Sequence, residues 1–171
     1  YSQGVAKTKL IVGSKGVKGT GTSIFFRPDA AIFKKRQFSS KIIEETLRTK
    51  AYLNPGLSLT FVDEISKTTT EYCYQDGIVA YLKELLEERK LEALGAQHLF
   101  LETNEKASVS IALAWTDTPK EEFISFANGI RTRDGGSHEM GAKSGIVKAV
   151  RNYLNVHNIN LKGVKLGSED I

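Results

Sequence analysis

Hydrophobic residues recur at helical spacing in three windows of this chain. The windows run from Ser39 to about Leu53, from Ile78 to about Leu91 and from Ser137 to about Asn155. Apolar residues at every third or fourth position place one face of a helix against a core, so each window predicts an amphipathic helix. Serine is a favoured helix N-cap. We therefore expect Ser39 and Ser137 to cap the first and third helices.

Apolar and polar residues alternate at strand spacing in a second set of segments. These segments are 57–61, 68–74, 97–102, 109–115 and 123–128. The polar stretch Asp63–Lys67 separates the first two, which predicts a hairpin. Strands that pair with their sequence neighbours, together with three helices, are typical of an α+β domain. We expect a mostly antiparallel sheet that helices cover on one face.

The connection between the last strand and the third helix combines positive charge with glycine. Arg131 and Arg133 stand just upstream of Gly135, Gly136 and Ser137. Glycine allows a positive φ or the close approach of another group, and the start of a helix presents unpaired N–H groups and the positive end of its dipole. The segment is therefore a place for an anion, or else a strand-to-helix connection whose arginines are solvated.

His138 and Glu139 follow at the start of this helix and suggest acid–base chemistry. A glutamate in the first turn is also ordinary compensation of the helix dipole. No serine or cysteine nucleophile is visibly paired with His138 in the sequence. The pattern favours structural roles for both residues.

Composition narrows the class of protein. The 171 residues are 40% hydrophobic, enough to bury the core of one compact domain or of two closely packed halves. There is no apolar run of about 18 residues and no leader sequence, so we expect a soluble cytoplasmic protein.

The single cysteine, Cys73, excludes an internal disulfide and is expected to be a packing residue. Three histidines without ligand spacing argue against a zinc site.

Charge is distributed unevenly along the chain. The net charge is only +4, but Lys7–Lys50 carries eleven bases against three acids, and Arg131–Lys165 carries seven against two. From Thr60 to Glu105 the balance reverses to ten acids against four bases. Two basic segments that share a face are the electrostatic footprint of nucleic-acid binding. The alternative is a solvated surface.

Several motifs follow one another in a fixed order over nearly the whole chain. They are Tyr1-Ser-Gln-Gly, Gly19-Thr-Gly-Thr, Phe26-Arg-Pro-Asp with Ile32-Phe33, Tyr52-Leu-Asn-Pro-Gly, Tyr74-Gln-Asp-Gly-Ile, Ala112-Leu-Ala-Trp and the block 123–141. With these motifs the chain resembles the second domain of the ATPase (B) subunit of bacterial type IIA DNA topoisomerases, that is, of either gyrase or topoisomerase IV. Cys73-Tyr-Gln-Asp-Gly and residues 163–171 are more similar to topoisomerase IV.

The resemblance implies a transducer domain with a ribosomal protein S5 domain 2-like fold in residues 21–171. Residues 1–20 are expected to be the trailing strand and linker of a missing ATP-binding domain. The transducer links ATP-driven dimer closure to passage of a DNA segment. The parent enzyme uses ATP and Mg²⁺, whereas this fragment is expected to be inactive, with no catalytic residue, cofactor or metal site of its own. The implied partners are double-stranded DNA, the DNA-cleaving A subunit and a second B subunit, near the bacterial chromosome and away from any membrane.

The resemblance also indicates which residues meet DNA. Arg133 matches a family position that lines the positively charged cavity for the transported DNA. We add Arg131, which precedes it, and Lys143, Lys148 and Arg151, because they are basic and follow in the next helix. On a continuous helix Lys148 and Arg151 share a face, and Lys143 lies off it.

Two other functions remain open at this stage. One is a stand-alone RNA-binding module of the same fold, which prefers structured RNA to duplex DNA. The other is a small hydrolase or transferase that uses His138 and Glu139.

Overall fold

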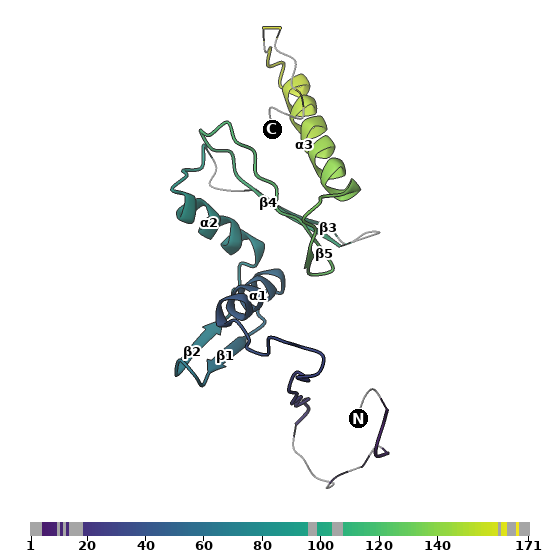
Figure 1. Cartoon of the computed structure of the whole chain (residues 1–171). Helices are drawn as coiled ribbons and strands as arrows, with labels where there is room; N and C mark the ends of the chain where they lie inside the picture. Colours follow the sequence, from purple (N-terminus) through teal and green to yellow (C-terminus); the bar gives the residue numbers. More distant parts are fainter. Residues whose placement is uncertain are drawn as a thin grey trace. The chain divides into compact units, whose positions relative to one another are not determined.

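The computed structural model describes residues 5–9, 11, 13, 19–95, 99–103, 108–160, 162–163 and 167. The chain divides into two compact units, Tyr1–Phe38 and Ser39–Ile171. The helices and strands named below belong to the second unit (Figure 1). Within the described residues, no helix is long and apolar enough to cross a membrane.

The first unit contains a turn built around Asp29. Its backbone carbonyl accepts the amides of Ile32 at 3.2 Å and Phe33 at 2.8 Å. Its carboxylate accepts the Ala31 amide at 2.8 Å. Asp29 thus closes the turn with both its backbone and its side chain, which is the usual role of aspartate in turns.

The first helix is followed by a hairpin, as predicted. Helix α1 spans Ser40–Leu53, strand β1 spans Leu59–Asp63 and strand β2 spans Thr68–Tyr72. The strands pair antiparallel, with Leu59 opposite Tyr72 and Asp63 opposite Thr68. Ser39 does occupy the N-cap position of α1, but its side chain makes no capping hydrogen bond. The hydroxyl of Ser40 donates to the Asp63 carboxylate at 2.6 Å instead, which joins the start of α1 to the end of β1.

The second helix and the next hairpin also match the sequence pattern. Helix α2 spans Ile78–Arg89, strand β3 spans Leu99–Thr103 and strand β4 spans Val109–Leu113. The two strands pair antiparallel, with Leu99 opposite Leu113. Gln97 and His98, where the sequence predicted this strand to begin, lie outside the described residues.

The last predicted strand is shorter than expected. Only Phe126–Ala127 forms a strand, β5, which pairs antiparallel with β6 at Ile130–Arg131. Asn128 and Gly129 have φ values of +50° and +75°, which is the backbone of a tight two-residue hairpin turn. The chain therefore folds back where the sequence pattern suggested that an extended strand ends. Helix α3 then spans Ser137–Val156, close to its prediction.

The α+β class is confirmed, but the sheet is divided. In the described residues the three hairpins form three separate two-stranded antiparallel ladders rather than one continuous sheet. Each ladder joins neighbours in sequence through a short connection. Among the described residues no ladder of hydrogen bonds links one hairpin to the next, so side-chain contacts set the position of each hairpin relative to the helices.

Tyr52 is the centre of the small core. Its side chain is 2% exposed, and the other buried hydrophobic residues that the structure describes are Ala51, Tyr72 and Val147. The Tyr52 ring stacks on Tyr74 with 3.7 Å between ring centroids. Its hydroxyl donates to Glu84 of α2, and burial raises the pKa of the phenol above its usual value. One side chain of α1 thus holds α2 and the segment after β2.

The expectation that Cys73 is a packing residue is wrong. Cys73 is exposed, and its sulfur lies 3.7 Å from the Gln75 amide nitrogen. Tyr72 occupies the buried position at the end of β2. Successive side chains on an extended backbone point to opposite sides, so the residue next to Tyr72 faces out.

Replacement of Gly77 by alanine should destabilise the fold more than the same change at Gly95. Both residues have positive φ, +54° and +73°, so each variant carries backbone strain, and the ψ of −127° at Gly77 makes that position unfavourable for any residue with a side chain. A Cβ at Gly77 would also lie 2.7 Å from Pro55 Cγ, whereas at Gly95 no atom of the described residues lies within 4 Å. We expect Gly77→Ala to lose roughly a further 1–3 kcal/mol in urea unfolding. Equal losses for the two variants contradict the packing argument.

Asp63 should make stability depend on pH under acidic conditions. The Ser40 hydroxyl, with the amides of Ile65 and Ser66, lowers the pKa of Asp63 to about 2. The folded pKa of Asp63 thus lies below the ordinary value of about 3.9 for an aspartate. The stabilisation from ionised Asp63 is therefore present above about pH 3.9 and is lost as the pH falls toward 2. We expect Ser40→Ala to raise the pKa of Asp63 in a carboxylate NMR titration. An unchanged pKa in that variant rules out the Ser40 hydrogen bond as its main cause.

Candidate nucleic-acid interface

The two arginines of the connection lie at the end of the last hairpin. Arg131 is the final residue of β6 and pairs across the ladder with Phe126. Arg133 lies in the turn that follows, and both arginines are exposed. Among the residues that the structure describes, neither guanidinium makes an ion pair with an acid. Two positive charges are therefore presented to solvent next to the start of α3.

Two glycines shape the backbone between Arg133 and α3. The amide of Gly135 donates to the Thr132 carbonyl at 3.2 Å, and its φ of +70° is in the left-handed region. A Cβ on Gly135 would lie 2.9 Å from a carboxylate oxygen of Glu139. The backbone conformation therefore favours glycine here, and a side chain would also have to displace the end of the Glu139 side chain.

The prediction that Ser137 caps the helix is wrong by one residue. Gly136 is the N-cap, and Ser137 is the first residue of α3. The Gly136 carbonyl accepts the amides of Glu139 at 3.1 Å and Met140 at 3.3 Å. A Cβ on Gly136 would lie 2.8 Å from the His138 ring, so a side chain at the N-cap position competes with that ring for space.

His138 and Glu139 belong to a polar cluster with two hydroxyl groups. His138 Nε2 lies 3.1 Å from Ser125 Oγ and 3.1 Å from Thr132 Oγ1. Ser125 donates its hydroxyl proton to the Glu139 carboxylate and also contacts the Thr132 hydroxyl. The Thr132 amide donates to the Ser125 carbonyl at 3.0 Å. This cluster joins the base of the β5–β6 hairpin to the first turn of α3.

The number of protons in this cluster determines which group donates each hydrogen bond. A carboxylate only accepts hydrogen bonds, so the single hydroxyl proton of Ser125 is given to Glu139. The bond between Ser125 and His138 then requires the proton on Nε2 of the ring. A nitrogen that already carries a proton cannot act as the base that activates Ser125.

The arrangement of these groups therefore differs from that of a catalytic triad. In a triad the acid orients the histidine, and the histidine takes the serine proton. Here Glu139 binds Ser125 directly. The sequence pattern did not reveal that Ser125 lies beside His138. The Asn128-Gly129 turn could have revealed it, because a two-residue turn fixes the register of the hairpin. With Ala127 opposite Ile130 and Phe126 opposite Arg131, one further step brings Ser125 opposite Thr132.

The three basic residues predicted on the last helix have different surroundings. Lys148 and Arg151 are exposed and three residues apart on the continuous helix α3, so they share a face as expected. Lys143 is half-buried and forms an ion pair with Glu121, and its ammonium lies 5.4 Å from the centre of the Phe123 ring. Lys143 thus fixes α3 to the segment before β5.

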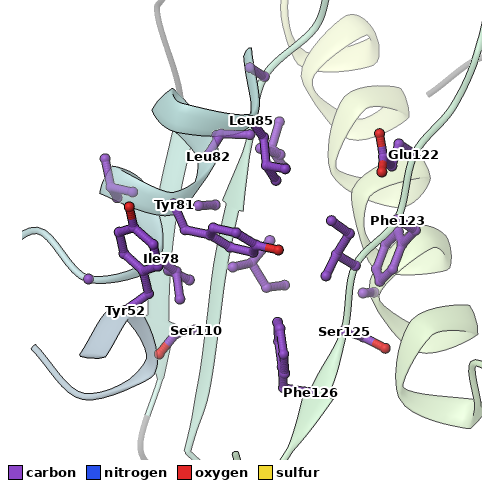
Figure 2. A pocket seen from close by; sticks show the side chains of 18 of the residues that line it. Tyr52, Ile78, Tyr81, Leu82, Leu85, Ser110, Glu122, Phe123, Ser125 and Phe126 are labelled. Carbon is purple, nitrogen blue, oxygen red and sulfur yellow. The ribbon is translucent and has the colours of Figure 1, made fainter. Parts of the chain in front are cut away.

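The segment before β5 is held from both sides. Glu121 pairs with Lys143 of α3, and Glu122 pairs with Arg89 at the end of α2. These two ion pairs border an open concave surface. Figure 2 shows Tyr81 of α2 and Phe126 of β5 turned toward each other in this surface. Their ring centroids are 6.4 Å apart. The concavity is lined mainly by apolar side chains, including Leu82, Leu85, Ile111, Trp115, Phe123 and Ile146.

No metal site is formed by the described part of the chain. It contains no group of three or more His, Cys, Asp or Glu side chains that could hold an ion.

The fold is similar to part of a gyrase B ATPase-domain structure. The crystal structure of the 43K ATPase domain of Thermus thermophilus gyrase B, in complex with an aminocoumarin, matches with a TM-score of 0.74 and 29% identity. The match covers 84% of this chain and 39% of that chain. Residues 77–171 match the family model described as DNA gyrase B, so the chain belongs to the DNA gyrase B family.

Relatives of both named types are similar to this chain. The B subunit of DNA topoisomerase 4 from Mycoplasma capricolum is 38% identical over 154 residues, which cover 89% of this chain and 23% of that protein. The B subunit of DNA gyrase from Helicobacter pylori is 32% identical over 167 residues, which cover 98% of this chain and 21% of that protein. The chain thus spans less than a quarter of the length of these two relatives.

Removal of the Ser125 hydroxyl should loosen the joint between the hairpin and α3. Ser125→Ala leaves the Glu139 carboxylate without its donor and the His138 ring without one acceptor. We expect a loss of about 0.5–1.5 kcal/mol in urea unfolding. Ser144→Ala, at an exposed position of the same helix, is the control and should change stability by less than about 0.5 kcal/mol. Equal stability of the two variants contradicts the structural role of the cluster.

Proposed function

We propose that this chain is the transducer part of the B subunit of a bacterial type IIA topoisomerase. In this role it relays ATP binding and hydrolysis to DNA strand passage and lines the cavity that holds the transported DNA. Residues 21–171 form the transducer, and residues 1–20 are the trailing strand and linker of an ATP-binding domain. The observation that carries the proposal is that Arg133 is exposed. It lies on the turn between α3 and the β5–β6 hairpin, where the Thr132 amide binds the Ser125 carbonyl.

The chemistry of the interface is neutralisation of phosphate charge. Arginine offers a rigid fork of donors that matches phosphate oxygens, and contacts to phosphates need no particular base sequence. Arg131 and Arg133 are exposed and carry no acid partner among the described residues. These two side chains therefore form the centre of the proposed DNA contact.

The helix residues contribute unequally to this contact. Lys148 and Arg151 share an exposed face of α3 and extend the basic surface. Lys143 is already paired with Glu121, so binding to DNA would require it to leave that carboxylate. We assign Lys148 and Arg151 to the outer part of the interface and Lys143 to a minor role.

The remaining parts of the function belong to the whole protein. We propose that ATP and Mg²⁺ bind outside this chain, which therefore does not hydrolyse ATP by itself. The partners of the whole protein are double-stranded DNA, the DNA-cleaving A subunit and a second B subunit. It acts in the bacterial cytoplasm on the chromosome. The match to a gyrase B ATPase-domain structure supports this assignment.

Reversal of charge at Arg133 should weaken binding to duplex DNA. We expect Arg133→Glu to lower the affinity of the chain for a short duplex and to reduce the slope of log K against log salt by about 0.9 for each phosphate that is no longer neutralised. Fluorescence anisotropy at several salt concentrations measures both quantities. Lys67→Glu, in the β1–β2 turn, makes the same change of charge and is the control.

Three results would each contradict part of the proposal. Equal weakening by Arg133→Glu and Lys67→Glu shows that only net charge matters. Displacement of the duplex by structured RNA at much lower concentration favours an RNA-binding module of the same fold. In the full-length protein, unaltered strand passage by Arg133→Glu removes Arg133 from the DNA cavity.

A further inference from the structure

Lys50 directs its charge inward, onto the tip of the last hairpin. It lies in the last turn of α1, and its ammonium donates to the Gly129 carbonyl at 2.6 Å, across 79 residues of sequence. The contact is partly buried. A hydrogen bond from a charged donor is roughly twice as strong as a neutral one, and removal from water strengthens it further. Lys50 is thus a strong link between α1 and the β5–β6 turn.

The hairpin depends on such a link because its own ladder is very short. Strands β5 and β6 have two residues each and pair with no other strand in the described residues. A hairpin of this size is not stable alone and takes its position from outside contacts. At its base the Ser125 and Thr132 hydroxyls bind the start of α3. At its tip the described contact is the ammonium of Lys50.

The chain between Gly129 and Arg133 is short and constrained. Gly129 is followed directly by β6, which ends at Arg131, and by Thr132, whose amide is bound to the Ser125 carbonyl. Tilting the tip of the hairpin therefore moves Arg131 and Arg133 together. The link at the tip and the contacts at the base together fix where both guanidinium groups are presented.

We propose that Lys50 is a positioning residue for the DNA contact of Arg131 and Arg133. It acts through the Gly129 carbonyl and does not itself touch DNA. The inference rests on the proposed function of Arg133. It also provides a physical path by which a displacement of α1 moves the DNA-facing arginines.

The first test measures the hairpin without DNA. Lys50→Met keeps the length of the side chain and removes the ammonium. We expect amide hydrogen exchange of Ala127 and Ile130 to become roughly tenfold faster, because one charged hydrogen bond to the turn is removed. Lys41→Met, on the same helix with its side chain 85% exposed, is the control and should leave these amides unchanged. Unchanged exchange in Lys50→Met overturns the proposal.

The second test asks whether Lys50 acts through Arg131 and Arg133. We expect Lys50→Met to weaken duplex binding about two- to tenfold in the wild-type chain and to have no further effect in a variant in which both Arg131 and Arg133 are replaced by alanine. Lys50→Arg, which keeps a cationic donor, should restore most of the affinity. Equal weakening by Lys50→Met in both backgrounds overturns the proposal, because it indicates direct contact between Lys50 and DNA.

The two tests also separate this inference from the proposed function. If Arg133→Ala binds duplex DNA as tightly as the wild-type chain, the DNA-binding role of Arg133 fails. The exchange of Ala127 and Ile130 amides still decides whether Lys50 holds the hairpin.

Discussion

Burial of Tyr52 is the interaction on which the rest of the second unit depends. Its ring stacks on Tyr74, and its hydroxyl donates to Glu84, which also pairs with Arg48. Burial of an aromatic ring together with satisfaction of its hydroxyl fixes both the distance and the rotation between α1 and α2. The orientation of α1 in turn sets where Lys50, two residues before Tyr52, directs its ammonium. The position of the last hairpin thus depends on the burial of Tyr52, through Lys50.

The basic residues of this chain perform two different tasks. Lys50 and Lys143 direct their charges to partners inside the unit, and Arg89 pairs with Glu122. Arg131 and Arg133 remain exposed. The internal contacts stabilise the surface from which the exposed arginines extend. A count of charges along the sequence cannot separate these groups, because the acid or carbonyl that engages each base lies far away in the chain.

Most of the local structure could be predicted, and the errors have identifiable causes. The predicted helices match α1, α2 and α3 closely because helical periodicity needs only neighbouring residues. The strand predicted over 123–128 was too long, since the Asn128-Gly129 turn was not recognised as the centre of a hairpin. The same omission hid the pairing of Ser125 with Thr132, and with it the partner of His138. The pattern predicted a place for an anion beside Arg131 and Arg133, and the resemblance added the prediction that Arg133 lines the DNA cavity.

The sequence by itself determined the α+β class, the helices, the β1–β2 hairpin and the family resemblance, since each rests on residues close together or on motifs in a fixed order. Only the tertiary structure decided that the sheet is divided, that Cys73 is exposed and that Ser125 gives its proton to Glu139. Only the tertiary structure shows that Lys50 binds the Gly129 carbonyl, 79 residues away in the sequence. Periodicity reports which side of an element is buried, whereas the partner of a buried polar group depends on how distant elements pack.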